Sequence, residues 1–216
     1  MKLDPTADAL LVIDLQHDFL PGGALAVPSG DEVVAPIAAL APAFATVVAT
    51  QDWHPMGHVS FASAHPGARP YGTIQLAQGT QELWPDHCVR GTRGAALHPQ
   101  LPDVELTLVL RKGTRREVDS YSAFRENVGP DGRRPTTGLA AWLAARGVRR
   151  VFVCGLARDF CVRWSAIDAA AEGLETLVLD DLTRPVFPER RAETDAAFAA
   201  AGVRTMRAGD LGRPAR

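Results

Sequence analysis

The chain has 216 residues, and its 23 Lys and Arg residues against 25 Asp and Glu residues give a formal net charge of −2. Hydrophobic residues make up 46% of the chain, which is ordinary for a protein with a buried core. A near-neutral balance without a basic run argues against a nucleic-acid or anionic-membrane partner. No apolar run approaches the roughly 20 residues of a membrane span.

The three cysteines cannot all pair within the chain, and the N-terminal residues lack the apolar segment of a secretory signal. Free thiols persist in a reducing compartment. We therefore expect a cytoplasmic protein.

Short apolar runs alternate with helical patterns along the chain. Strands are predicted at residues 9–13, 46–50, 104–110, 151–154, 176–179 and 203–206. Helices are predicted at residues 31–43, 137–146, 159–172 and 189–201. Strands that alternate with helices form parallel sheets, whose buried strands are continuous apolar runs. We expect an α/β fold with three α/β/α layers and a six-stranded, mostly parallel, doubly wound sheet, in a single domain over residues 1–216.

Residues 53–102 lack regular periodicity and are rich in Gly, Pro and polar residues. Ordinary connections in compact domains have about 4–6 residues. A segment this long inside one domain is usually functional.

Reactive side chains follow four of the predicted strands. Asp14 follows the first strand, Asp52 the second and Lys112 the third, and the fourth leads through Gly155 to Cys161. Ligands of doubly wound sheets bind outside the carboxyl ends of the strands. These four side chains are therefore candidates for one site.

Two of these residues suggest a nucleophile. The only lysines are Lys2 and Lys112, whereas the other cations are arginines. Cys161 follows Asp159, a candidate N-cap, and the first turn of a helix lowers the pKa of a thiol, as does a nearby lysine. The alternative is a buried structural cysteine, a description that fits Cys154 inside a strand.

A second set of residues suggests a metal site. Asp52 and His54, two residues apart on an extended segment, point to the same side and can bind one ion. His58 and His87 can complete a set suited to Zn²⁺, Fe²⁺ or Mn²⁺. The alternative is a loop whose histidines bond to the backbone, and Cys88, beside His87, is expected to point away.

Seven motifs in chain order, from about residue 8 to residue 180, resemble those of nicotinamidases in the isochorismatase-like cysteine hydrolase superfamily. They are residues 13–19, 21–25, 52–55, 84–89, 112–113, 119–124 and 155–162. Two departures are visible, because Arg158 stands where these enzymes often have Thr and His17 where Asn is frequent.

The resemblance implies a catalytic triad of Asp14, Lys112 and Cys161. It also implies that Asp52, His54 and His87 bind one divalent metal ion. His58 is a further candidate ligand, because it binds the metal in some relatives and not in others.

The same resemblance implies the substrate contacts. A cis peptide between Leu156 and Ala157 would turn the N–H groups of Ala157 and Cys161 into an oxyanion hole. Three aromatic residues would hold a flat substrate ring: Phe19, Trp84 and Tyr121.

The implied reaction is hydrolysis of nicotinamide to nicotinate and ammonia, in NAD salvage, through a thioester on Cys161. Pyrazinamide is an expected second substrate, and relatives are commonly homo-oligomeric. The alternatives are a related carbamoyl or ureido amidohydrolase, an isochorismate-type ether hydrolase, which would not need Cys161, and a non-catalytic, metal-stabilised binding module.

Overall fold

The computed structural model describes residues 1–101 and 106–212. Its six-stranded parallel sheet has the order β5-β2-β1-β6-β7-β8. The strands are β1 (Asp8–Ile13), β2 (Thr46–Asp52), β5 (Leu108–Lys112), β6 (Arg150–Leu156), β7 (Glu175–Arg184) and β8 (Arg204–Met206). Each predicted strand has its counterpart, which confirms the α/β fold. Positions 104 and 105 of the predicted third strand lie outside the described residues.

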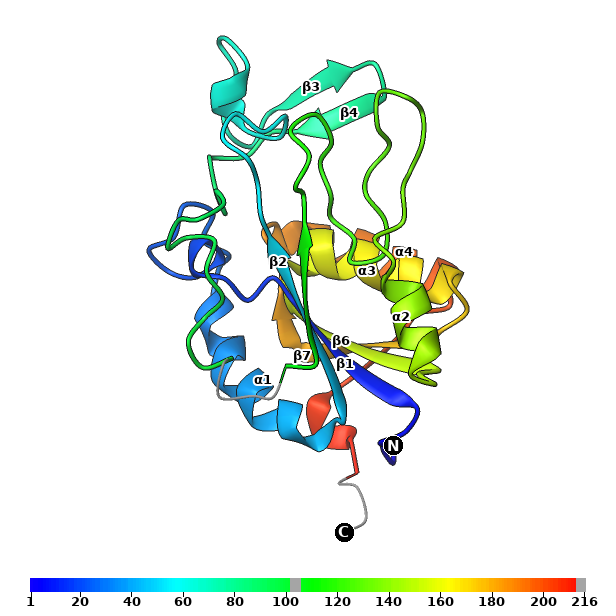
Figure 1. Cartoon of the computed structure of the whole chain (residues 1–216). Helices are drawn as coiled ribbons and strands as arrows, with labels where there is room; N and C mark the ends of the chain where they lie inside the picture. Colours follow the sequence, from blue (N-terminus) through cyan, green and yellow to red (C-terminus); the bar gives the residue numbers. More distant parts are fainter. Residues whose placement is uncertain (102–105, 213–216) are drawn as a thin grey trace.

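Helices cover both faces of the sheet, which confirms the three layers (Figure 1). α1 (Val34–Leu40) lies on one side, and α2 (Leu139–Ala145), α3 (Arg163–Ala171) and α4 (Arg191–Ala200) lie on the other. Within residues 1–101 and 106–212, none of the helices has the length and apolar character needed to cross a membrane.

The chain reverses its direction across the sheet between β1 and β6. From β1 it continues outward to β2 and β5, and from β6 it continues to β7 and β8 on the other side. Ile13 pairs with Gly155, so the segments after β1 and β6 leave the sheet side by side. Such a switch point is where doubly wound sheets bind ligands.

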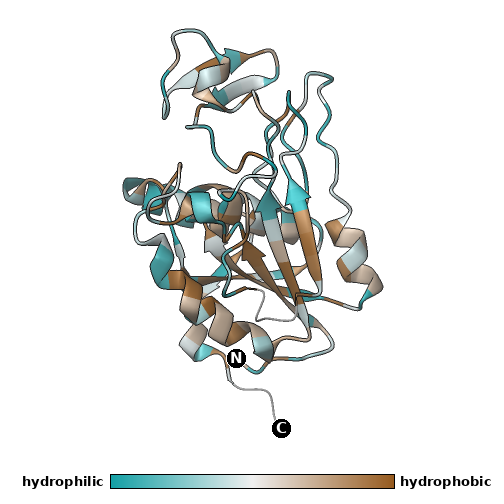
Figure 2. Ribbon diagram, turned by 60° about the vertical axis from the view of Figure 1, so that its left-hand side comes forward, coloured by the Kyte–Doolittle hydropathy of each residue, from teal (hydrophilic) through white to brown (hydrophobic). Residues whose placement is uncertain are grey.

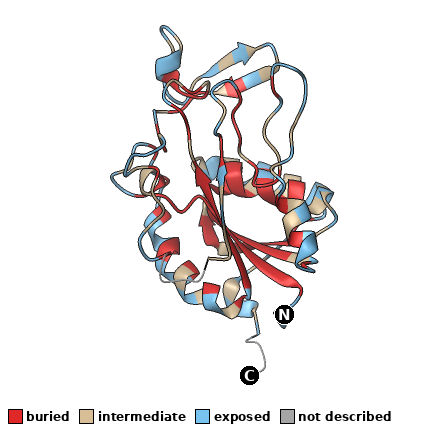
Figure 3. Cartoon of the chain, in the orientation of Figure 1, coloured by how far each residue is buried: buried red, intermediate tan, exposed pale blue. Residues whose placement is uncertain are grey.

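The central strands are buried because helices pack on both of their faces. β1 and β2 are buried at every position, as the red strands of Figure 3 show, and the apolar colouring of Figure 2 follows the same strands. In the edge strand β5, half-buried and exposed residues alternate up to Lys112, which is buried. The carboxyl end of β5 therefore reaches from an exposed edge into the interior.

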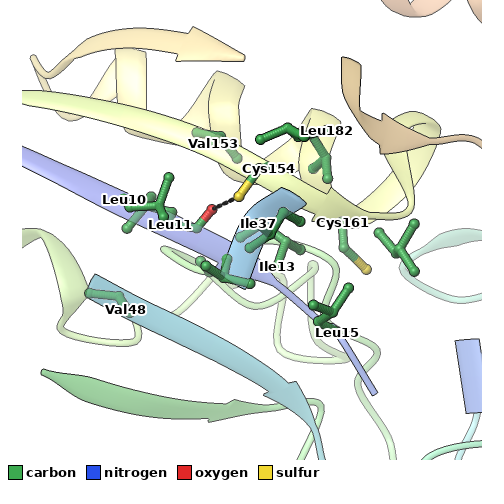
Figure 4. Packing of buried hydrophobic residues seen from close by; sticks show 14 of the residues in the cluster. Leu10, Leu11, Ile13, Leu15, Ile37, Val48, Val153, Cys154, Cys161 and Leu182 are labelled. Atoms are coloured by element: carbon green, nitrogen blue, oxygen red, sulfur yellow. Dashed lines mark hydrogen bonds between the residues drawn. The ribbon is translucent and has the colours of Figure 1, made fainter. Parts of the chain in front are cut away.

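Cys154 packs in the core between β1 and the helices. Its thiol donates a weak hydrogen bond of 3.6 Å to the Leu11 carbonyl oxygen, among Leu10, Ile13 and Val153 (Figure 4). This surrounding agrees with the structural role predicted for Cys154.

The segment 53–102 contains a small antiparallel hairpin, β3 (Thr73–Leu76) and β4 (Gly79–Glu82), that projects beyond the sheet (Figure 1). No strand was predicted in this segment. Both strands are short and mostly polar, and their partly exposed residues lack the apolar alternation by which a strand is predicted.

The helix predicted at residues 31–43 is divided into a 3₁₀ turn (Gly30–Val33), α1 and a second 3₁₀ turn (Ala41–Ala43). Pro36 lies in the first turn of α1, where its missing N–H costs no hydrogen bond. The helix predicted at residues 159–172 is likewise divided, into a π-helical turn (Arg158–Val162) and α3.

Candidate active site

Lys112, the last residue of β5, lies at the centre of the site. Its ammonium nitrogen lies 2.8 Å from Asp14 Oδ2, 2.5 Å from Asp52 Oδ1 and 3.4 Å from Cys161 Sγ. It also donates to the Ser120 carbonyl oxygen at 3.1 Å. All four predicted strand-end residues are buried and meet at this lysine.

Asp14 is held in place by β2. Its φ of 47° turns the chain away from β1, and the Thr50 hydroxyl donates to Asp14 Oδ1 at 2.6 Å. The Asp14 N–H donates back to the Thr50 hydroxyl oxygen at 3.0 Å. Thr50 was not among the predicted site residues, although a polar residue at the end of an apolar, adjacent strand is a sign of such a role.

The low pKa expected for the Cys161 thiol is wrong. Burial raises the pKa of the Cys161 thiol well above its usual range, and Lys112 offsets this only in part because Asp14 and Asp52 are also near. Burial also raises the pKa of Asp14, against the attraction of Lys112. A neutral thiol next to a carboxylate suits proton transfer between the two groups.

Cys161 lies in the π-helical turn that follows β6. The sequence predicts Asp159 as the N-cap of its helix, and this prediction is wrong. Its carboxylate instead accepts hydrogen bonds from the backbone N–H groups of Val186 (2.9 Å) and Phe187 (2.8 Å). The peptide between Leu156 and Ala157, just before this turn, is cis, as expected.

The metal-ligand candidates surround one carboxylate oxygen. Asp52 Oδ2 lies 3.5 Å from His54 Nε2 and 4.0 Å from His87 Nε2. His54 Nδ1 donates to the Gly113 carbonyl oxygen at 2.9 Å, and His87 Nδ1 donates to that of Pro85 at 2.8 Å. Both rings therefore direct their Nε2 lone pairs toward Asp52, which is how metal-binding histidines are oriented.

The charges of this group also suit a cation. Burial and the neighbouring His54 lower the pKa of His87 to about 4, so that its ring is neutral. Burial opposes the ionisation of Asp52, yet Lys112 and the two histidines hold its pKa well below the usual range. Burial opposes the charge of His54, yet Asp52 holds the pKa of its ring above the usual value, so a bound cation would take the place of a proton there. One carboxylate oxygen and two imidazole nitrogens fit a divalent transition metal.

His58 lies next to this group with both ring nitrogens engaged. Nδ1 lies 2.8 Å from the Ser60 hydroxyl, and Nε2 lies 3.1 Å from the Val118 carbonyl oxygen. Its ring stacks on His54 with centroids 4.2 Å apart. His54, His58 and Asp119 form a second group, in which one possible ligand atom of each residue lies within 4.8 Å of the others.

The predicted aromatic residues fall in two places. Phe19 packs against His87 with ring centroids 5.6 Å apart. Trp84 Nε1 donates to the Tyr121 hydroxyl at 3.4 Å. Phe160, which the prediction missed although it precedes Cys161, lies 4.8 Å from Trp84 and 5.4 Å from Tyr121, between ring centroids.

Phe61 was also missed. Its ring centroid lies 5.6 Å from that of each of His54, His58 and His87, so it forms an apolar wall of the metal-ligand group. No sequence pattern distinguishes Phe61 from an ordinary core residue.

Comparison with known proteins places this geometry in a family. Residues 8–209 match the model of the isochorismatase domain. The chain is 49% identical over 178 residues to the nicotinamidase of Acinetobacter baylyi, across 82% of this chain and 81% of that relative. It is 43% identical over 201 residues to the nicotinamidase of Escherichia coli, across 90% and 92% of the two chains.

Solved structures of nicotinamidases and pyrazinamidases are similar to this chain. An Acinetobacter baumanii nicotinamidase pyrazinamidase superposes with a TM-score of 0.89 at 41% identity, across 96% of this chain and 99% of that one. The PnC1 protein of L. infantum in complex with nicotinate gives 0.85 at 39% identity, across 98% of each chain. The pyrazinamidase of Pyrococcus horikoshii in complex with zinc gives 0.73 at 33% identity, across 93% and 98%.

Proposed function

The chain belongs to the isochorismatase family, and from that premise we propose that it is a metal-dependent cysteine amidohydrolase that converts nicotinamide to nicotinate and ammonia. One observation carries the proposal. The Lys112 ammonium contacts the Cys161 thiol, the Asp14 carboxylate and the metal-facing Asp52 carboxylate together.

The first half of the reaction forms a thioester. Asp14 takes the proton of the Cys161 thiol, and the thiolate attacks the carboxamide carbon. Asp14 then returns the proton to the amide nitrogen as the C–N bond breaks, because the leaving group must depart as ammonia. Lys112 holds the Asp14 carboxylate beside the sulfur throughout.

The second half hydrolyses the thioester. Asp14 takes a proton from a water molecule that attacks the acyl carbon, and the C–S bond breaks as that proton passes to the sulfur. Nicotinate leaves and the thiol is restored. The N–H groups of Ala157 and Cys161 receive the negative oxygen in both halves, a contact worth about 2.7–4 kcal/mol per donor in comparable sites.

Asp52, His54 and His87 would hold the metal, and His58 stays outside the ligand set because its ring nitrogens are engaged. A zinc, iron or manganese ion bound there would supply a Lewis acid that orients the ring nitrogen of the substrate. The zinc complex of the Pyrococcus horikoshii relative supports zinc first.

Phe19, Trp84 and Tyr121 would hold the pyridine ring. Trp84 and Tyr121 are joined by a hydrogen bond, and Phe19 lies against His87, so the ring would lie between the aromatic residues and the metal ligands. Flat rings gain about 0.5–1.5 kcal/mol from such stacking beyond the area they bury.

The experiment measures ammonia release by the metal-loaded protein from nicotinamide, pyrazinamide and a panel of carbamoyl and ureido amides. We expect nicotinamide to be hydrolysed with the highest kcat/KM and pyrazinamide to be a second substrate. Faster turnover of a carbamoyl or ureido amide would support the alternative amidohydrolase. No turnover of any amide would support a binding module.

Metal removal tests the cofactor in the same assay. Chelation should abolish ammonia release, and a divalent transition metal should restore it. Full activity in a sample shown to be metal-free by elemental analysis would contradict the proposal.

Two expectations about the whole protein stay proposals, a homo-oligomer and a cytoplasmic location. The three cysteines are free and buried, as in a reducing compartment. Light scattering of the purified protein tests the first, and cell fractionation tests the second.

A further inference from the structure

Arg158 is a buried cation in the turn that carries the nucleophile. It lies three residues before Cys161 in the π-helical turn Arg158–Val162, and its side chain is 1% exposed. The proposed reaction assigns Arg158 no role. A buried guanidinium must be paired to offset its lost hydration.

The guanidinium joins the turn to two other elements. Nη1 lies 2.8 Å from Asp180 Oδ1 and donates to the Thr183 hydroxyl at 3.1 Å, and both partners are on β7. Nη2 donates to Asp195 Oδ1, on α4, at 2.6 Å. The guanidinium carbon also lies 5.3 Å from the Phe198 ring centroid.

A surface arginine already joins the same two acids. Arg191 Nη2 lies 2.8 Å from Asp180 Oδ1, and Arg191 Nε lies 3.1 Å from Asp195 Oδ2. The Arg191 side chain is 51% exposed, so its pairing costs little hydration. Arg191 therefore already links α4 to β7 at the surface through Asp180, whereas only Arg158 links both elements to the turn.

The turn is anchored from the other side by the next residue. Asp159 accepts the N–H groups of Val186 and Phe187, beyond the end of β7. Two consecutive side chains thus fix the five-residue turn to β7, to the segment that follows β7 and to α4. Cys161 lies two residues after Asp159 in the same turn, and its sulfur must stay within reach of Lys112 and Asp14.

We propose that Arg158 is a positioning residue for the nucleophile, one that keeps the Cys161 sulfur at its 3.4 Å distance from Lys112 Nζ. The proposal rests on the proposed function, in which this sulfur attacks the amide. Arg158 acts through the backbone of the turn, since its guanidinium contacts β7 and α4.

The experiment compares Arg158→Thr and Arg158→Lys with the matched control Arg191→Met, which breaks the surface half of the same ion-pair network. For each metal-loaded protein we measure kcat and KM for nicotinamide, the thermal midpoint, and the rate at which iodoacetamide alkylates Cys161, by mass spectrometry. Cys88 and Cys154 are fully buried, whereas Cys161 is 6% exposed, and the masses of the alkylated peptides distinguish the three thiols.

Arg158→Thr should lower kcat roughly 10- to 100-fold and change KM by less than about 3-fold, as expected when a reacting group is misplaced by about 1 Å. Its Cys161 alkylation rate should change as well. Arg158→Lys should recover part of kcat, and Arg191→Met should keep kcat within about 2-fold even where its thermal midpoint falls.

Wild-type kcat and alkylation in Arg158→Thr, or equal losses in Arg191→Met, would overturn the proposal. If Arg158→Thr does not fold, Asp195→Asn removes one contact of Arg158 from outside the turn, and an unchanged kcat and alkylation rate in that variant would overturn it too. If the wild type does not hydrolyse nicotinamide, the proposed function fails, and the alkylation rates still decide the role of Arg158.

Discussion

The site has two halves that meet at Lys112 and differ in how their charges are balanced. In the nucleophile half, the lysine ammonium lies against Asp14 and Cys161, and Thr50 occupies the remaining Asp14 oxygen. In the metal-ligand half, Asp52 Oδ2 and two imidazole Nε2 atoms face one another, and the Nδ1 atoms of both rings donate to backbone carbonyl oxygens. Lys112 balances the charge of the first half, whereas the second half presents one carboxylate oxygen and two ring nitrogens that together can bind a cation.

The largest expected effect falls on the nucleophile half alone. Cys161→Ala should lower kcat for nicotinamide by at least about 10⁴-fold, because the covalent step is lost. Metal binding should stay at wild-type stoichiometry, because Cys161 is not a ligand. Elemental analysis beside the ammonia assay checks both, and a metal-free variant would show that the two halves are not separable.

Lys112→Met should affect both halves through stability. Without the ammonium, Asp14 and Asp52 stay buried with oxygens within 4.8 Å of each other and of the Cys161 sulfur. Removing one partner of a buried ion pair typically costs about 3–5 kcal/mol, and we expect a loss of that size in urea unfolding. Lys2→Met, which changes the other lysine at an exposed position, is the control and should stay within about 0.5 kcal/mol. A similarly small loss for Lys112→Met would contradict the balancing role.

His54→Ala tests the metal-ligand half. Loss of this ligand should weaken zinc binding by at least about 100-fold, measured by competition with a chromophoric chelator, since even residues behind the ligands contribute 10- to 100-fold. Cys161 should still be alkylated, because Lys112 and Asp14 remain. His98→Ala, which changes a histidine outside the metal-ligand group, should leave zinc affinity unchanged.

The smallest expected effect concerns His58, the further candidate metal ligand. His58→Ala should weaken zinc binding by no more than about 10-fold, because His58 supports His54 by stacking while its nitrogens bind Ser60 and Val118. A loss as large as that of His54→Ala would make His58 a ligand and enlarge the metal-ligand half.

The meeting of Asp14, Asp52, Lys112 and Cys161 was predictable from the sequence. Continuous apolar runs mark buried parallel strands, and the carboxyl ends of such strands lie at one edge, so residues far apart in the chain could be placed together. The metal-ligand pair Asp52 and His54 was predictable for a local reason, because alternate residues of an extended segment face the same side.

The features that could not be predicted from the sequence depend on contacts between residues far apart in the chain. Asp159 has the local pattern of an N-cap, yet its partners are N–H groups 27 and 28 residues away. The raised pKa of Cys161 also comes from tertiary structure. The helix terminus near Cys161 can be predicted from the local sequence, whereas the burial that raises its pKa cannot. The polar hairpin β3–β4 has no apolar face from which a strand could be predicted.

Asp52 gives one oxygen to Lys112 and turns the other toward the histidines. An engineer who replaced Asp52 to change metal preference would therefore also remove a counter-ion of the buried lysine. Conversely, replacing Lys112 would remove the cation that lowers the pKa of the Asp52 carboxylate. In the proposed enzyme, a change of Asp52 would thus affect both metal binding and the charge around the thiol, and new activities built on this scaffold must preserve or replace both functions of this one carboxylate.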